Sequence, residues 1–178
     1  MKHTNQFTKI AAVLMIAALE AMAEDQPSRR IVVSFADRKL ALLEGDRVMK
    51  VYDIAVGKPT TPSPTGEYKI VSHVANPTWY GPHKVVGPGP QNPVGTRWMG
   101  LNAKGYGIHG TNAPRSIGKA ESHGCIRMRN RDVEELFRMV DVGVAVELDD
   151  ERPEIFNQIL AKDEVAASSN NSGLSKGE

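Results

Sequence analysis

The feature that most restricts how this chain can fold is a series of short apolar runs separated by turn residues. Residues 31–35 and 39–43 are two such runs, and Ala36-Asp37-Arg38 separates them. Residues 48–56 alternate between two sides of an extended chain, beginning and ending with valine. Short runs joined by tight turns are typical of consecutive antiparallel strands. We therefore predict a mostly β, antiparallel domain.

The second half of the chain predicts further strands and one clear helix. Strands are expected at residues 67–74, 98–101, 106–109 and 144–148. Asn130 is a suitable N-cap for a helix that ends near Gly143. The apolar residues that recur there at helical spacing are Val133, Leu136, Phe137 and Val140.

Residues 76–97, called here the proline-rich segment, differ from the rest of the chain because they contain five prolines and four glycines. Loops of this length inside a domain are uncommon and often act as lids or binding surfaces. Trp79 and Tyr80 lie in this segment. Their rings could line a substrate groove, or they could pin the segment to the core.

The one cysteine of the chain, Cys125, is the strongest candidate for chemistry. A thiolate near neutral pH needs a base, and an imidazole such as that of His109 is the usual partner. Gly107, Gly110 and Gly124 flank these residues, and glycines leave backbone N–H groups open to a developing oxyanion. Taken singly, each residue also has an ordinary alternative, since a lone cysteine is usually a small buried apolar side chain.

Residues 1–23 have the order of a secretory signal peptide. Lys2 and Lys9 form a charged start, residues 10–19 an apolar run, and Ala21-Met22-Ala23 a cleavage site. The apolar run is too short to span a bilayer as a helix. We expect an exported protein of the periplasm or cell envelope, without a stable membrane anchor.

The charge balance of the chain restricts its possible partners, and its length restricts the number of domains. Beyond residue 23, acidic and basic residues are equal in number, so nucleic-acid binding has no electrostatic basis. The length of the chain beyond residue 23 fits one domain, which we place at residues 30–149. A partly disordered C-terminal extension is expected at 150–178. Residues 153–161 of the extension are expected to form a short helix. A single cysteine in an exported domain indicates a reactive free thiol.

The motif around the cysteine resembles the L,D-transpeptidase family, also called the YkuD domain. It consists of His109-Gly110, a loop, and Ser122-His123-Gly124-Cys125-Ile126-Arg127. Other segments resemble the family in the same order, at residues 61–68, 76–79, 89–97 and 108–112. The resemblance covers about residues 30–149, and five ordered segments are far more specific than a Cys–His pair alone.

This resemblance implies acyl transfer on the stem tetrapeptides of peptidoglycan, in a β-rich fold with the cysteine in a groove. Cys125 would attack the carbonyl of a diaminopimelate residue and expel the terminal D-Ala as a thioester forms. An amine from a second stem peptide, or from an envelope protein, would resolve that thioester. His109 matches the family's base, oriented by the backbone carbonyl of Gly110. The N–H groups of Gly124 and Cys125 match the oxyanion hole.

The motif and the proline-rich segment together supply the candidate substrate-binding residues. Ser122 and His123 belong to the motif, and Trp79 and Tyr80 lie in the segment expected to cover the groove. Arg127 stands where some members carry asparagine, and its guanidinium suits the carboxylates of a tetrapeptide donor. A surface ion pair is the alternative for Arg127, with Asp132, Glu134 or Glu135 as partner. No cofactor or metal is expected.

Three other functions remain open from the sequence. Water could resolve the same thioester, which would make the protein an L,D-carboxypeptidase or another cysteine hydrolase. His109, His123 and Cys125 could instead bind a metal, although His123 and Cys125 are closer in sequence than most structural zinc ligands. A catalytically silent envelope-binding domain is disfavoured by the intact Cys–His pair.

Overall fold

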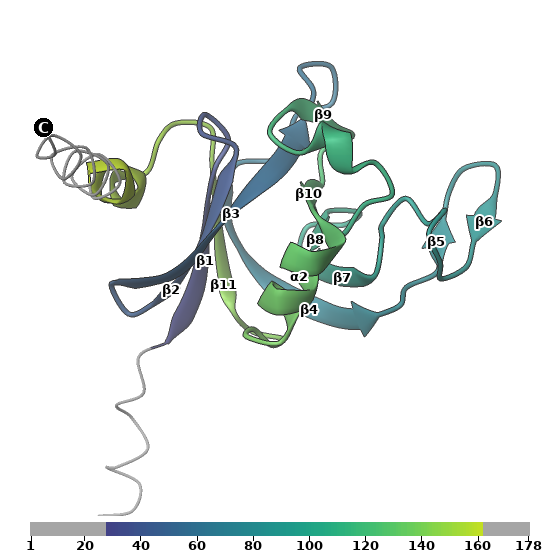
Figure 1. The fold of residues 1–178 in the computed structure, drawn as a ribbon, viewed down its shortest axis with the longest axis horizontal. Coiled ribbons are helices and arrows are strands. Elements are labelled where there is room, and N and C mark those ends of the chain that lie inside the picture. Colours follow the sequence, from purple (N-terminus) through teal and green to yellow (C-terminus); the bar gives the residue numbers. More distant parts are fainter. Residues whose placement is uncertain (1–27, 162–178) are drawn as a thin grey trace, which may run out of the picture.

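The computed structural model describes residues 28–161 as a two-layered β structure with a helix on one side (Figure 1). The expected signal peptide at residues 1–23 and the end of the expected C-terminal extension, residues 162–178, lie outside the described residues. Within residues 28–161, no helix is both long and apolar enough to cross a membrane.

The strands are short apart from β3 and β4. They are β1 (Arg29–Ser34), β2 (Lys39–Glu44), β3 (Arg47–Gly57), β4 (Gly66–Ala75), β5 (Trp79–Tyr80), β6 (Val85–Val86), β7 (Arg97–Leu101), β8 (Gly107–His109), β9 (Ala120–Ser122), β10 (Ile126–Met128) and β11 (Ala145–Asp149). The helical elements are the 3-10 turn η1 (Pro114–Ser116), helix α2 (Asn130–Phe137) and a last helix at residues 154–161.

The long strands β3 and β4 each belong to both layers. The first part of β3 pairs with β2, and Ile54 and Ala55 then pair with β10. The first part of β4 pairs with β11, and from Ile70 onward it pairs with β7 across an irregular register. Strands that change layers at bends or bulges are a common way to build such corners. One layer therefore contains β1, β2 and β11, and the other contains β7, β8 and β10 (Figure 1).

The hydrophobic core lies between these two layers, and α2 closes one side of it. Val133 and Leu136 of α2 are fully buried because their spacing places them on one face of the helix. The Phe137 ring stacks on His73 of β4 at 3.5 Å between centroids. The main core residues from the strands are Ile31, Leu40, Leu42, Ile54, Ile70, Met99, Ile108, Ile126 and Met128.

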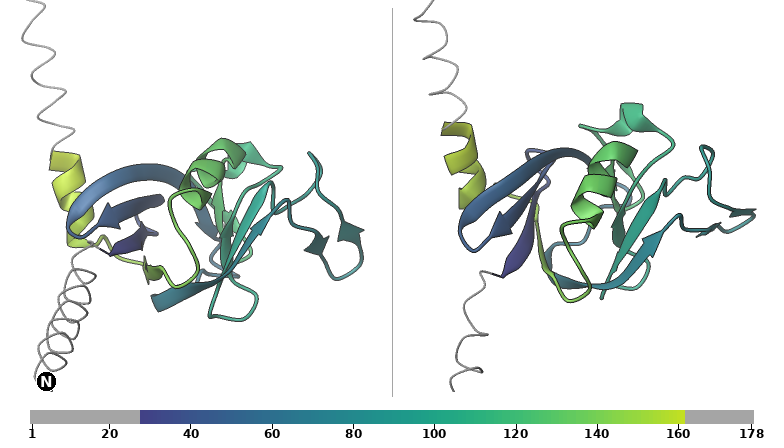
Figure 2. Two further views of the ribbon diagram at one scale, coloured as in Figure 1. Left: turned by 90° about the horizontal axis from the view of Figure 1, so that it is seen from below. Right: turned by 60° about the horizontal axis from the view of Figure 1, so that its bottom comes forward.

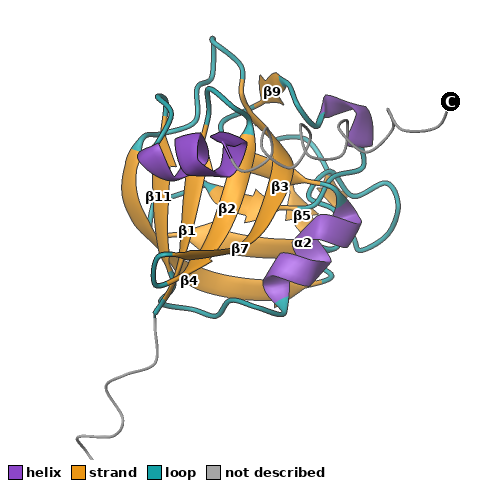
Figure 3. Cartoon of the chain, turned by 60° about the vertical axis from the view of Figure 1, so that its left-hand side comes forward, coloured by secondary structure: helices purple, strands orange, loops and turns teal. Residues whose placement is uncertain are grey.

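The last helix covers the outer face of the β1–β2 layer (Figure 3). Phe156 is 1 % exposed and packs in a second apolar cluster with Val32, Ala41 and Leu43. Burial of an aromatic side chain of this size contributes about 2–3 kcal/mol to the free energy of unfolding. Residues 154–161 are therefore an integral cover of this layer.

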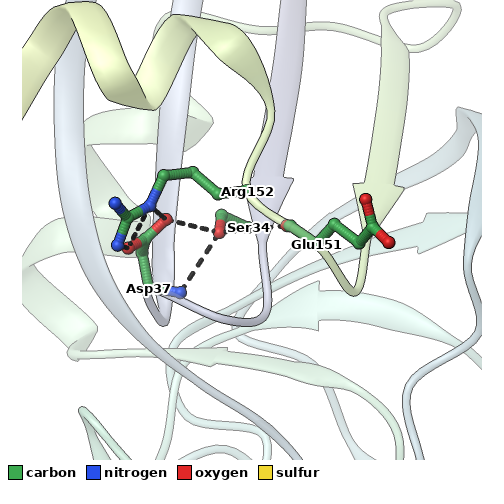
Figure 4. Close-up of polar contacts among 4 residues, drawn as sticks. All are labelled: Ser34, Asp37, Glu151 and Arg152. Carbon is green, nitrogen blue, oxygen red and sulfur yellow. Dashed lines mark hydrogen bonds and ion pairs between the residues drawn. The ribbon is translucent and has the colours of Figure 1, made fainter.

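An ion pair fixes the chain where it enters the last helix (Figure 4). Arg152 Nε donates to both carboxylate oxygens of Asp37 at 2.9 Å, and the Ser34 hydroxyl donates to Asp37 Oδ2 at 2.7 Å. Ser34 is fully buried. The Arg152 guanidinium, as the largest cause, lowers the pKa of Asp37. The turn between β1 and β2 thus anchors the segment that follows β11.

The structure confirms the predicted mostly β fold and the helix after Cys125, with two differences in detail. Most strand pairs are antiparallel, but β1–β11, β8–β10 and β3–β9 are parallel. Helix α2 ends at Phe137, before Gly143, because hydrogen bonds from Arg138 to Glu135 and from Met139 to Leu136 tighten its last turn.

Candidate active site

The parallel strands β8 and β10 bring the segments that carry the sequence-predicted base and nucleophile side by side. Their register pairs Ile126 with Ile108 and Arg127 with His109. Ile108 and Ile126 point into the core. Because side chains alternate along a strand, His109 and Arg127 point to the opposite face. Cys125 directly precedes β10, and its thiol lies 3.5 Å from the backbone oxygen of Gly105, in the loop before β8.

His109 is held in one orientation by its neighbours. It is 4 % exposed, and its Nδ1 lies 2.5 Å from the backbone oxygen of Gly110. A carbonyl oxygen only accepts hydrogen bonds, so Nδ1 carries the proton and Nε2 is left as the acceptor. Trp98 of β7, in register with His109, stacks near the imidazole at 5.5 Å between centroids.

Burial keeps both members of the Cys–His pair uncharged. The pKa of His109 is lowered from 6.5 to about 4, chiefly by burial and also by the nearby positive charge of Arg127, while the hydrogen bond to Gly110 opposes this change. Burial also raises the pKa of the Cys125 thiol above its ordinary value of 9.0, while a backbone hydrogen bond from Gly107 and the charge of Arg127 oppose this change. At neutral pH the resting site is therefore a thiol beside a neutral imidazole.

Residues 122–125, called here the nucleophile turn, are fixed by the buried Ser122 side chain. Its hydroxyl donates to the Cys125 carbonyl at 2.6 Å and accepts from the Gly124 N–H at 3.0 Å. The Ser122 carbonyl accepts from Lys58 N–H at 3.1 Å and from the Thr61 hydroxyl at 3.3 Å. The loop after β3 therefore supports the backbone that carries Cys125.

Gly124 is required in this turn for two separate reasons. Its φ of +108° lies in a region that residues with a Cβ rarely adopt. A Cβ at this position would also lie 2.7 Å from the Tyr106 ring and 3.2 Å from the Pro62 carbonyl oxygen. A glycine here lets the Tyr106 ring pack directly against the turn.

The Gly124 N–H, which the resemblance assigns to the oxyanion hole, donates to Ser122 Oγ within the nucleophile turn. The family motif could not predict this hydrogen bond, because a sequence motif carries no information about the orientation of the Ser122 hydroxyl. The N–H of Cys125 itself is the donor that remains from the expected pair.

The remaining predicted substrate-binding residues lie at different depths. Arg127 is half-buried and faces the same side of the sheet as His109. Two carboxylates suggested as alternative partners for Arg127 are paired elsewhere, Glu135 with Lys50 and Asp132 with Arg129. His123 is exposed at the surface of the nucleophile turn.

Trp79 and Tyr80 belong to a hairpin that projects from the body of the molecule (Figure 2). The Trp79 ring lies over Gly81 of the same hairpin, where an added Cβ would overlap it. Tyr80 pairs across the hairpin with Val85, and both are well exposed, at 78 % and 63 %. The Trp79 ring thus packs against its own hairpin.

A buried asparagine fixes the rest of the proline-rich segment. Asn92 is fully buried, and its Nδ2 donates to the carbonyls of Pro77 at 2.7 Å and Gly87 at 3.2 Å. Its Oδ1 accepts from Val94 N–H at 3.0 Å. The segment is therefore closed around one amide side chain.

The alternative metal site is not assembled in the described part of the chain. Among residues 28–161, no three His, Cys, Asp or Glu side chains come together in a way that could hold a metal ion. His109 is buried on β8 and already uses Nδ1 for Gly110, whereas His123 is exposed.

Comparisons with known proteins agree with this geometry. The profile of the L,D-transpeptidase catalytic domain (YkuD) matches residues 28–148. The chain belongs to the L,D-transpeptidase family. YkuD of Bacillus licheniformis, a protein assigned to the L,D-transpeptidases, is 48 % identical over 119 residues, which are 67 % of this chain and 64 % of that protein. YqjB of Bacillus subtilis, with the same assignment, is 40 % identical over 126 residues, or 68 % and 71 % of the two chains.

A solved structure supports the same conclusion at the level of the fold. The catalytic domain of the Enterococcus faecium L,D-transpeptidase superposes with a TM-score of 0.57 at 28 % identity. The match covers 70 % of this chain and 99 % of that domain. This chain matches less than two thirds of the length of the Bacillus licheniformis relative. The shared part is the catalytic domain.

The structure adds residues to this L,D-transpeptidase site that the sequence did not reveal. Trp98 beside His109 and Tyr106 beside Gly124 were assigned only to strands, because neither aromatic ring belongs to a recognisable motif. Asn130 was predicted to cap α2, and this prediction is wrong. Arg129 occupies the cap position, and Asn130 Oδ1 accepts hydrogen bonds from Thr96 and Thr111 instead.

Proposed function

We propose that this domain is an L,D-transpeptidase that acts on the stem tetrapeptides of peptidoglycan. The observation that carries the proposal is the placement of His109 on β8, next to the strand β10 that Cys125 directly precedes, with His109 Nδ1 bound to Gly110. That bond leaves Nε2 unprotonated. A neutral thiol and a base fixed in this way can form an acyl-enzyme.

In the acylation step, Cys125 Sγ attacks the carbonyl carbon of the diaminopimelate residue while His109 Nε2 takes the thiol proton. The Cys125 N–H would stabilise the oxyanion that forms. When the intermediate collapses, the C–N bond to the terminal D-Ala breaks, and the imidazolium returns the proton to the leaving amine. A thioester on Cys125 and a free D-Ala result.

In the second step, an amine attacks the thioester and His109 accepts its proton. The new amide bond forms as Cys125 leaves as a thiol, which restores the resting neutral pair. The acceptor would be the amine of a second stem peptide or of an envelope protein. A thioester of this kind must outlast attack by water, and a cover over the groove would serve that purpose.

The donor would be held by residues around the nucleophile turn. Arg127 lies beside both reacting groups and carries the positive charge that suits the carboxylates of a tetrapeptide. Ser122 holds the shape of the turn, and the exposed His123 would contact the donor chain. Trp79 and Tyr80 on the projecting hairpin would contact the more distant part of the stem peptide.

We also propose that the protein is exported and acts in the periplasm or cell envelope, without a stable membrane anchor. The charged, apolar and Ala-x-Ala order of residues 1–23 supports this proposal, as does a substrate that lies outside the cytoplasm. N-terminal sequencing of protein extracted from the envelope should give a start near Glu24. Recovery of protein that still begins at Met1 would contradict export.

The reaction is tested by incubating the protein with disaccharide-tetrapeptide and analysing the products by mass spectrometry. A cross-linked dimer with release of D-Ala is the expected result. A tripeptide as the sole product would mean that water resolves the thioester, and the protein would then be an L,D-carboxypeptidase. Release of D-Ala by Cys125→Ala would exclude Cys125 as the nucleophile.

The acyl-enzyme is tested separately with a carbapenem, whose ring opening traps the thioester. Intact-protein mass spectrometry and peptide mapping should place one adduct on Cys125. His109→Gln should slow its formation by about 10²–10⁴-fold, the range of general acid–base assistance. His83→Ala, a change in the proline-rich segment, is the control and should form the adduct at the original rate. An adduct on a serine would overturn the assignment.

A further inference from the structure

Asn130 lies behind the base and joins three parts of the chain. It is the first residue of α2, and its Oδ1 accepts the Thr111 N–H at 3.1 Å and the Thr96 N–H at 3.3 Å. Thr111 lies shortly after the end of β8, and Thr96 lies in the proline-rich segment, directly before β7. The side-chain oxygen of Asn130 therefore connects α2, β8 and the proline-rich segment.

The peptide between Gly110 and Thr111 links this oxygen to His109. The C=O and N–H of a trans peptide point in opposite directions. Here the N–H is directed at Asn130 Oδ1, so the C=O is directed back at His109 Nδ1, 2.5 Å away. The Gly110 N–H is also fixed, since it donates to the Arg97 carbonyl at 3.1 Å. Rotation of this peptide would break both bonds at once.

We propose that Asn130 is a positioning residue that sets the tautomer and orientation of the His109 imidazole through the Gly110–Thr111 peptide. The role rests on the proposed function, because it assigns His109 as the base. Without the acceptor at Asn130, the peptide can rotate and Gly110 no longer selects the Nδ1–H tautomer. Nε2 then carries the proton in part of the molecules, and those molecules lack a base.

The surroundings of Asn130 favour this role over helix capping. A capping side chain would bond to N–H groups of its own helix, but the Val133 N–H donates to the Arg129 carbonyl. Gly95 and Gly110 both pack against Asn130 Oδ1, and a Cβ at either position would overlap it. The close approach of both loops to this oxygen therefore requires Gly95 and Gly110 as well as Asn130.

The experiment compares three substitutions at this position with one in the core of α2. Asn130→Ala removes the acceptor, Asn130→Ser shortens the side chain and cannot reach both N–H groups, and Asn130→Asp keeps an oxygen in the same place. Val133→Ala is the matched control, because it weakens α2 from a fully buried position without touching Oδ1. Imidazole ¹⁵N shifts of His109 and the rate of carbapenem acylation are measured for each, together with thermal unfolding.

The wild type should show a single Nδ1–H tautomer. Asn130→Ala and Asn130→Ser should show a mixed tautomer and acylate about 10–100-fold more slowly, while Asn130→Asp keeps the Nδ1–H tautomer. Val133→Ala should lower the melting temperature and leave the ¹⁵N shifts unchanged. If Asn130→Ala does not fold, Asn130→Ser against Asn130→Asp gives the same comparison.

Unchanged ¹⁵N shifts in Asn130→Ala, or in Asn130→Ser where only that variant folds, would overturn the positioning role. A mixed tautomer in Val133→Ala would also overturn it, because loss of helix stability would then explain the effect. A wild type that forms no adduct on Cys125 would contradict the proposed function instead. The ring shifts still report on Asn130 in that case, so the two failures are distinguishable.

Discussion

On the scale of single residues, the uncharged Cys–His pair determines how the reaction should depend on pH. As the proposed base, His109 must be neutral to accept the thiol proton, and its pKa is lowered from 6.5 to about 4. The acylation rate should therefore stay level from about pH 8 down to about pH 5 and decrease only as the pH falls through about 4. Rates of carbapenem acylation measured across this range test it, and a decrease centred near pH 6.5 would contradict it.

The same pKa shift links His109 to stability. Between pH 6.5 and about 4, the unfolded chain binds a proton at this residue and the folded chain does not. The free energy of unfolding should thus be highest above pH 6.5 and decrease as the pH falls toward 4. Urea unfolding at several pH values measures this decrease. In His109→Gln the decrease should be smaller, and an identical profile would exclude His109 as its source.

Arg127 offers a test of donor recognition at the same scale. Arg127→Lys keeps the positive charge but loses the planar, two-pronged contact with a carboxylate. The KM for the tetrapeptide should increase about tenfold, which corresponds to about 1.4 kcal/mol. Alkylation of Cys125 by iodoacetamide should hardly change. An unchanged KM in steady-state kinetics would indicate that Arg127 has a structural role instead.

On the scale of elements, Asn92 should decide whether the proline-rich segment stays closed. Asn92→Ala removes the four hydrogen bonds of a fully buried side chain and leaves carbonyls unpaired, which should cost about 2–3 kcal/mol. Hydrogen exchange of residues 76–97 and urea unfolding measure the effect. The matched control is Asn112→Ala, because Asn112 makes one exposed bond to the Gln91 carbonyl. Equal losses in both variants would contradict the assignment.

The sequence predicted the elements better than their connections. Strand periodicity located β1 to β4, because apolar residues there alternate or cluster between turns. It could not show that β3 and β4 change layers, since a strand keeps the same alternation on both sides of a bend. The two-residue strands β5 and β6 are too short to have a period at all.

In the candidate site, too, the sequence identified the residues better than their contacts. Cys125 and His109 were identified from residue chemistry and motif spacing, which are written in the sequence. The use of the Gly124 N–H by Ser122 depends on a hydroxyl rotamer, and the contacts of Asn130 depend on two loops that meet it from elsewhere. Such contacts exist only once the chain has folded.

On the scale of the whole molecule, Phe156 should contribute to stability but not to catalysis. Phe156→Ala leaves a cavity over Val32, Ala41 and Leu43 and should lower the free energy of unfolding by about 3–5 kcal/mol. Carbapenem acylation should proceed at the original rate, because Phe156 packs on the layer that does not carry Cys125. Gln158→Ala, an exposed change in the same helix, is the control for urea unfolding. A stability loss no larger than that of the control would show that this helix is not part of the folded core.

The anchoring of Arg152 by Asp37 has a further consequence for how the molecule can be attached to a support. The chain leaves the described structure from the helix on the β1–β2 layer, whereas Cys125 directly precedes β10 of the other layer (Figure 1). A tether beyond residue 161 would pull on the Asp37–Arg152 pair and the turn between β1 and β2. An enzyme immobilised in this way would therefore be held by the layer that does not carry its thiol.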